Sequence, residues 1–311
     1  MKTASMMRVL APFALLLGWS GVQAEPYYIG AKACEKCHEA EVKVWEGTAH
    51  FKSYKEVHKK PEAKKILKAA GSERSMKKDP VCASCHYTQI SKGPGKKAKA
   101  KSGPSCESCH GPASGWKEAH NDFGGVEKAK DEDPAHREQR IAKTTEMGMI
   151  WPSQLFDVAS NCMSCHGLTK PGVEDALGKM LDAGHPIEPD FELVAYSQGS
   201  VRHRFYPPDV TVNKEMSKAE LSRMFAVGQI AKLLSASQAA DNSSHPKYKA
   251  AQAERAESAR AALKPVAGIG AVGAFLKAPS EKTARAAVAA IEGEDLSAKL
   301  GGSLPAPSSY K

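Results

Sequence analysis

Eight cysteines and four histidines of this chain follow one repeated pattern. The pattern is Cys-x-x-Cys-His, and its four copies are Cys34/Cys37/His38, Cys82/Cys85/His86, Cys106/Cys109/His110 and Cys162/Cys165/His166. The copies use all eight cysteines in the sequence, so no thiol is left for a disulfide. Two thiols at this spacing can add to the vinyl groups of a haem, and the adjacent imidazole can bind the iron. The pattern therefore predicts four covalently bound haem c groups.

Zinc sites and thioredoxin-like redox pairs are the alternatives, because both also use Cys-x-x-Cys. A histidine directly after the second cysteine in every copy favours haem over both.

The segment after the first motif predicts a helix that carries a further histidine. Between Glu39 and His58 only Gly47 disfavours a helix, and the apolar residues give it a surface for packing. His38 and His50 are twelve residues apart, which corresponds to about 18 Å along a helix axis. Both cannot bind the same iron at that separation, so we expect His50 to bind a different haem.

The first 24 residues have the features of a secretory signal. Lys2 and Arg8 precede an apolar run over residues 9–19, and small residues lead to a cleavage point after about Ala24. The run is too short for a membrane span, and no later stretch is long and apolar enough for one. These features predict a soluble, periplasmic mature protein.

The chain is basic, with a formal net charge of +9 that includes Lys2 and Arg8 of the signal. Haem propionates offset part of this charge. We therefore interpret the excess as a docking surface for redox proteins and as partners for propionates, and not as a nucleic-acid site. An ordinary solvated surface is the alternative for the two runs in which the lysines concentrate: Lys52, Lys55, Lys59, Lys60, Lys64, Lys65 and Lys68, and then Lys96, Lys97, Lys99 and Lys101.

The composition changes near residue 211, and we divide the chain into a signal (1–24), a tetrahaem domain (25–210) and an Ala-rich helical extension (211–311). Ser217 and Glu220 have the spacing of a capping box at the start of a helix. Further helices are predicted over about 246–263 and 280–291, and residues 301–311 are expected to be disordered. The fold class predicted is mainly α: a multihaem cytochrome c fold with few strands and long loops, and an added C-terminal helical bundle.

Two stretches of the sequence resemble the tetrahaem cytochrome c-554 family. In the first, a Trp and a Thr-Ala-His triplet follow the first motif, as in CEKCHEAEVKVWEGTAH. In the second, Gly-Pro-Ser precedes the third motif and Gly-Pro follows it, with His120 ten residues after His110. The resemblance covers about residues 28–167.

The resemblance implies a ligand set. His120 would be the second ligand of the first haem, on His38, and His50 that of the fourth haem, on His166. The third haem, on His110, would take a histidine from the C-terminal part, where this sequence departs from the family pattern. We favour His185, because its Gly-His-Pro context is similar to a distal-ligand segment of larger multihaem cytochromes, with His203 as the alternative.

The second haem, on His86, lacks a strong sixth ligand in that family. An open iron position would suit a diatomic ligand such as nitric oxide, whereas two imidazoles suit electron transfer. The histidines left unassigned could close the site here: His58, His136, His245 and whichever of His185 and His203 the third haem does not use.

Three functions are compatible with these features. The first is electron transfer between redox proteins through stacked haems; the family suggests a multihaem oxidoreductase as donor, within nitrogen metabolism, and a cytochrome as acceptor. The second is reduction of nitric oxide, nitrite or hydroxylamine at an open haem on His86. The third is a subunit of a haem-bearing filament.

Overall fold

The computed structural model describes residues 25–187, 191–207 and 209–311, so the signal predicted at 1–24 lies outside the described residues. Helices dominate the described parts, and the strands there form a single two-stranded sheet. The predicted mainly α class is therefore confirmed. No helix among the described residues has both the length and the apolar character that crossing a membrane requires.

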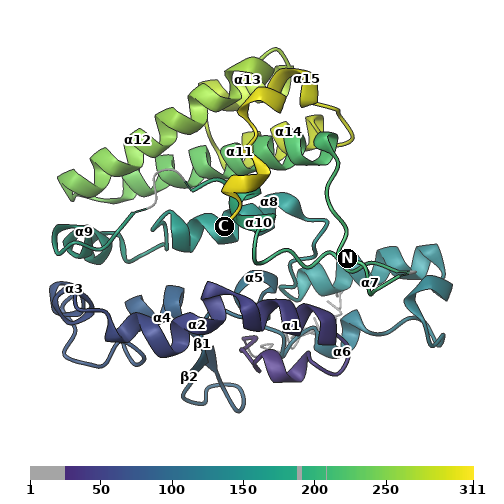
Figure 1. Cartoon of the computed structure of the whole chain (residues 1–311), viewed down its shortest axis with the longest axis horizontal. Coiled ribbons are helices and arrows are strands. Elements are labelled where there is room, and N and C mark those ends of the chain that lie inside the picture. The colour runs from purple at the N-terminus through teal and green to yellow at the C-terminus, as the bar shows by residue number, and fades with distance from the viewer. Residues whose placement is uncertain (1–24, 188–190, 208) are drawn as a thin grey trace, which may run out of the picture.

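The elements up to α7 occupy the lower half of the molecule in Figure 1, and most later helices occupy the upper half. The lower elements are α1 (Glu39–Gly47), α2 (Ala49–Glu56), α3 (Ala63–Ala69), α4 (Pro80–His86), β1 (Thr88–Ile90), β2 (Lys99–Ser102), α5 (Cys106–His110), α6 (Lys117–His120) and α7 (Pro134–Glu146). The later elements are α8 (Leu155–His166), α9 (Glu174–Asp182), α10 (Leu193–Ser197), α11 (Lys218–Asn242), α12 (Pro246–Leu263), α13 (Gly270–Lys277), α14 (Glu281–Ala290) and α15 (Ser297–Leu300).

The helix predicted from Glu39 to His58 is interrupted at Thr48. Thr48 has extended backbone angles (φ −82°, ψ 161°), and its hydroxyl accepts a hydrogen bond from the Phe51 amide at 3.2 Å. The same hydroxyl donates to the Trp45 carbonyl at 2.6 Å. Thr48 thus ends α1 and caps α2, because a threonine at this position satisfies a free amide of the new helix. The Thr-Ala-His triplet is therefore a helix start, and it places His50 in the first turn of α2.

The strands β1 and β2 form an antiparallel hairpin, with Gln89 opposite Ala100 and Ile90 opposite Lys99. All four lysines of the second run lie in or beside this hairpin and are exposed. The first run, on α2 and α3 and between them, is likewise exposed.

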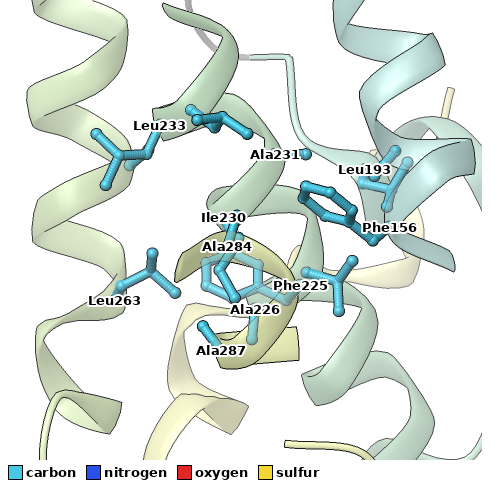
Figure 2. Packing of buried hydrophobic residues seen from close by; sticks show 14 of the residues in the cluster. Phe156, Leu193, Phe225, Ala226, Ile230, Ala231, Leu233, Leu263, Ala284 and Ala287 are labelled. Atoms are coloured by element: carbon cyan, nitrogen blue, oxygen red, sulfur yellow. The ribbon is translucent and has the colours of Figure 1, made fainter. Parts of the chain in front are cut away.

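The C-terminal helices build the largest apolar core (Figure 2). The predicted capping box begins α11: Ser217 accepts from the Glu220 amide, and the Glu220 carboxylate accepts from the Ser217 amide at 2.8 Å. The predicted helices over 246–263 and 280–291 correspond to α12 and α14, while α13 was not predicted. Phe225 and Ile230 of α11 pack with Leu263 of α12 in this core.

The same core includes residues that precede the predicted C-terminal extension. Phe156 of α8 and Leu193 of α10 pack against α11. The fourth Cys-x-x-Cys-His motif, at the end of α8, is thereby held against the C-terminal extension.

The prediction of disorder over residues 301–311 was wrong. The Lys311 amide donates to the Ala195 carbonyl at 2.9 Å, and the Lys311 carbonyl accepts from the Ser200 amide at 2.7 Å. These backbone bonds attach the C-terminus to the end of α10. Main-chain pairing of this kind leaves no trace in composition, which was the basis of the prediction.

Candidate haem sites

Three of the four Cys-x-x-Cys-His motifs form the last turn of a helix. His86, His110 and His166 are the final residues of α4, α5 and α8. The first motif is a turn just before α1, closed by a hydrogen bond from the His38 amide to the Cys34 carbonyl at 3.1 Å. Residues i, i+3 and i+4 share one face of such a turn. Each motif therefore places its two cysteines and its histidine on the same side of the turn.

Cys37 differs in its surroundings from the other predicted attachment cysteines. The sequence assigned it to a thioether bond with the first haem, but its side chain is exposed, whereas the other seven cysteines are buried or half-buried. Its motif is a turn ahead of α1, whereas the other three motifs end helices. The thioether bond of Cys37 therefore stays a prediction. If it forms, the edge of the first haem at this thiol is open to solvent.

Each motif histidine faces one other histidine. The ring centroids are 6.2 Å apart for His38 and His120, 5.8 Å for His50 and His166, 6.0 Å for His86 and His185, and 6.3 Å for His110 and His203. A nitrogen–metal bond of about 2 Å, with about 1 Å more from that nitrogen to the ring centre, gives about 6 Å across a metal with imidazoles on opposite sides. The spacing of all four pairs fits an iron between two imidazoles.

The structure places His185 differently from the sequence expectation. His185, which we favoured for the third haem, lies beside His86 of the second motif, and His203 lies beside His110. The second motif, which the family resemblance leaves with an open position, therefore has a histidine opposite it.

His185 follows a glycine with positive φ that ends α9. At the end of α9, Gly184 has φ +99°, its amide donates to the Leu181 carbonyl at 3.1 Å, and the His185 amide donates to the Met180 carbonyl at 2.9 Å. This is the Schellman arrangement, in which glycine supplies the positive φ that other residues adopt only with strain. The Gly-His-Pro sequence is thus a helix terminus followed by a proline that cannot continue the helix.

An asparagine side chain holds the segment that carries His203. Asn213 Nδ2 donates to the Arg202 carbonyl at 2.7 Å, and Asn213 Oδ1 accepts from the Arg204 amide at 3.0 Å. The two bonds fix the backbone on both sides of His203, which lies in no helix or strand. The sequence analysis did not identify Asn213, and nothing near it in the sequence distinguishes it from other loop asparagines.

The third motif is anchored on several sides. His110 Nδ1 donates to the Ile150 carbonyl at 2.9 Å, and the Ile150 amide donates back to the His110 carbonyl at 3.0 Å. The Glu107 carboxylate is buried and accepts from the amides of Ile29, Gly30 and Ala113 at 2.6–3.0 Å. This explains why the motif includes a glutamate between its cysteines: the side chain closes the N-terminal segment onto α5.

Five of the eight paired histidines use Nδ1 to bond an oxygen. The acceptors are the carboxylate of Glu41 for His38 and backbone carbonyls of Ile150, Lys117, Pro186 and Val201 for His110, His120, His185 and His203. When Nδ1 carries the proton in such a bond, Nε2 keeps its lone pair for a metal, and the ring orientation is fixed. The hydrogen bonding thus suits ligation through Nε2.

Burial keeps several of these imidazoles neutral. Removal from water, with a smaller effect of the nearby His185 and Lys60, lowers the pKa of His86 to about 4. Burial also lowers the pKa values of His110, His120 and His185. At His38 the Glu41 carboxylate raises the pKa instead. A neutral imidazole is the form that binds iron.

The motifs lie next to one another in a fixed order. The thiols of Cys34 and Cys106 lie close enough to shift the pKa of each other, so the first and third motifs are neighbours. The thiols of Cys85 and Cys165 likewise shift the pKa of each other, so the second and fourth motifs are neighbours. Asn161 Nδ2 of α8 donates to the Ser108 carbonyl at 2.7 Å and links the fourth motif to the third. The order in space is first, third, fourth, second.

The other three histidines do not face a motif histidine among the ring contacts of the described residues. His136 donates to Glu132 at 2.8 Å, and His245 bonds Asp182 at 3.0 Å while it caps α12. The Nδ1 atom of His58 is buried without a partner among the described residues. The histidines that contact a motif histidine are instead His50, His120, His185 and His203.

A row of polar residues on α12 also reaches the fourth motif. Tyr248, Gln252 and Arg255 are fully buried, and their side chains bond the carbonyls of Gly167 and Leu168, directly after His166. The sequence analysis missed this row. Its signal was present: polar residues with the i, i+4, i+7 spacing of one helix face, within an Ala-rich helix.

Comparison with known proteins gives one family. Residues 33–111 match the family described as Cytochrome c554 and c-prime, which is the family that the sequence resembles. The match includes the first three motifs and His50, and ends one residue after His110. Neither the curated proteins nor the solved structures give a match.

Proposed function

We propose that this chain, with its partial match to the cytochrome c554 family, is an exported tetrahaem c-type cytochrome that carries electrons between redox proteins. The observation that supports this most strongly is the pairing of every motif histidine with a second histidine at 5.8–6.3 Å. Each haem, when bound, supplies a one-electron couple whose potential depends on its ligands and burial.

The proposed ligand pairs are His38 with His120, His86 with His185, His110 with His203, and His166 with His50. The eight cysteines, the exposed Cys37 included, would hold the haems through thioether bonds. Two imidazoles leave no position for a substrate on the iron, and this favours electron transfer over reduction of a nitrogen oxide.

The order of the motifs suggests the route that electrons take through the protein, in either direction. The first and second motifs form its two ends, and the third and fourth lie between them. At one end the His38 side chain is 47% exposed, and the adjacent Cys37 is exposed as well. At the other end His86 lies close enough to the exposed Lys60 for that charge to lower its pKa. Both ends therefore offer access to a partner.

The exposed lysines near the second motif suggest an acidic partner there. All seven lysines of the first run are exposed, and such a surface speeds encounters with a protein of opposite charge. In keeping with the family, we propose a multihaem oxidoreductase as donor and another cytochrome as acceptor, in the periplasm.

The test is spectroscopic and uses the purified, exported protein. The haem content should be four per chain, from the pyridine haemochrome spectrum and the intact mass. The electron paramagnetic resonance spectrum of the oxidised protein should contain only low-spin ferric signals, and nitric oxide should not change the optical spectrum of the reduced protein. A high-spin signal together with nitric oxide binding at one haem in four would instead favour an enzyme with an open site on His86. Fewer than four haems would refute the tetrahaem proposal.

A further inference from the structure

The arginine of the buried row on α12 has no acidic partner within residues 25–187, 191–207 and 209–311, which the structure describes. The Arg255 side chain is 0% exposed. Its guanidinium donates to the Gly167 carbonyl at 3.2 Å, to Gln252 Oε1 at 2.6 Å and to Met163 Sδ at 3.5 Å, and none of these acceptors is charged. Its Nε has no hydrogen-bond partner among the described residues. A buried cation without a carboxylate is costly, so its retention calls for a reason.

The chain makes room for this guanidinium at a specific place. Gly167 has φ −89°, an angle open to any residue, so its backbone does not require glycine. A Cβ there would lie 2.8 Å from Arg255 Cζ, closer still to Nη2, and 2.6 Å from the Met163 carbonyl oxygen. Glycine at this position therefore leaves room both for the end of α8 and for the close approach of the charge to the peptide that follows His166.

The charge also remains in place at neutral pH. Burial lowers the pKa of Arg255 to about 10. The group is thus protonated over the whole range in which an exported protein works.

We propose that Arg255 raises the reduction potential of the fourth haem, on His166, by holding a permanent positive charge against the backbone directly after its attachment motif. The inference rests on the proposed tetrahaem function. A buried cation stabilises the form with the additional electron, because Coulomb energy is large where water does not screen it. The C-terminal extension, which the sequence left without a role, would thereby set a potential inside the electron path.

The first variants alter the charge at position 255. R255Q removes the charge and keeps a hydrogen-bonding side chain, whereas R255K keeps a cation without the planar fork. Four midpoint potentials are measured by redox titration of each purified holoprotein at about pH 6, where a buried lysine retains its proton more readily than at higher pH. We expect one of the four midpoints to fall in R255Q and to fall clearly less in R255K.

A second variant leaves Arg255 in place and neutralises it. Gln252 Oε1 already accepts from Arg255, so Q252E puts a carboxylate of the same shape beside the guanidinium, and it removes the bond that Gln252 Nε2 donates to the Gly167 carbonyl. The same midpoint should fall in Q252E. The matched control is R260Q, on the same helix, where the arginine is partly exposed and pairs with Glu257; its four midpoints should equal those of the wild type. The transition of the fourth haem is identified in H50A, which removes its proposed second ligand.

The outcomes separate the inference from the function on which it rests. If the four midpoints of Q252E equal those of the wild type, the inference is overturned, whatever the result for R255Q. The Q252E test therefore remains decisive even if R255Q does not fold. Equal falls in R255Q and R255K overturn it too, because they indicate loss of packing and not of charge. In both cases the proposed function stands if the wild-type protein has four low-spin haems. If the wild-type protein lacks four low-spin haems, both the proposed function and the inference on Arg255 fail.

Discussion

The imidazole rings of His86 and His185 lie with their centroids 6.0 Å apart, and both groups are largely removed from water. In the family that the sequence resembles, the haem on the corresponding motif histidine has an open position. Here the end of α9 places His185 opposite His86, where it would fill that position. The difference separates an electron carrier from a protein that binds a diatomic ligand, because the sixth ligand determines which chemistry the iron can perform.

Removal of His185 should reopen that position. In H185A we expect one of the four haems to become high-spin in the oxidised protein, and nitric oxide to bind one haem in four after reduction. Electron paramagnetic resonance and optical titration provide the two measurements.

The matched control for H185A is H58A. His58 is also partly buried, but it does not face a motif histidine among the contacts of the described residues. All four haems should stay low-spin in H58A. A wild-type protein that already binds nitric oxide, or an H185A protein that stays fully low-spin, would contradict the assignment of His185 to the second haem.

Gly184 should matter for the same haem without touching it. Its φ of +99° is strained for alanine by roughly 1 kcal/mol. G184A should therefore displace His185 in part of the population and give a partial high-spin signal. G293A is the control, since Gly293 has φ +79° and open space around it, in the C-terminal extension. G293A should lower the free energy of unfolding to a similar degree and leave the spin state unchanged; equal spin states in both variants would refute the positioning role of Gly184.

The sequence predicted the parts of the site that depend on local spacing. The four motifs, the mainly α class and the helix starts at Ser217 and Pro246 follow from patterns within a few residues, and the structure has the predicted helices there. The positions of His185 and His203 did not follow, because each depends on a distant contact. Spacing carries no information on which motif the end of α9 or the Asn213 loop packs against.

Two residues show what cannot be predicted from the local sequence of a motif. The Thr-Ala-His triplet is compatible with a helix cap at Thr48, but the otherwise continuous helical pattern around it favoured one long helix. The exposure of Cys37 was not readable at all, because its motif has the same spacing as the three whose cysteines are better covered. Spacing specifies which residues share a side of a turn, whereas burial depends on which elements pack over that turn.

The loop of His203 should depend on Asn213. N213A removes two hydrogen bonds, each worth about 1 kcal/mol, that flank His203. We expect a high-spin signal from the third haem, and we expect its low-spin signal to be lost at a lower denaturant concentration than in the wild type. N242A is the control, because Asn242 is exposed at the end of α11. If N213A and N242A have the same spectra, Asn213 does not position the ligand.

Glu132 should make the protein sensitive to acid. Its carboxylate is 0% exposed and accepts from Arg140 Nε at 2.7 Å, from Arg140 Nη2 at 2.5 Å and from His136 at 2.8 Å. The bonds from Arg140 lower the pKa of Glu132 from 4.5 to about 2. A carboxyl whose pKa is lower in the folded state stabilises that state above its unfolded pKa, and the contribution is lost as the pH falls through the folded value.

The variant E132Q isolates this effect. The wild type should exceed E132Q in free energy of unfolding at neutral pH, and roughly 3 kcal/mol of that difference should disappear between about pH 4.5 and pH 2, as the size of the shift implies. Denaturant unfolding followed by circular dichroism measures the difference. E138Q, at an exposed site on α7, which also carries Arg140, should keep a constant difference from the wild type.

Arg140 also donates to the His120 carbonyl at 2.7 Å. Loss of its partner should therefore loosen the second ligand of the first haem and add a high-spin signal in E132Q, whereas an E132Q protein with wild-type spectra and a pH-independent stability difference would separate Glu132 from both roles.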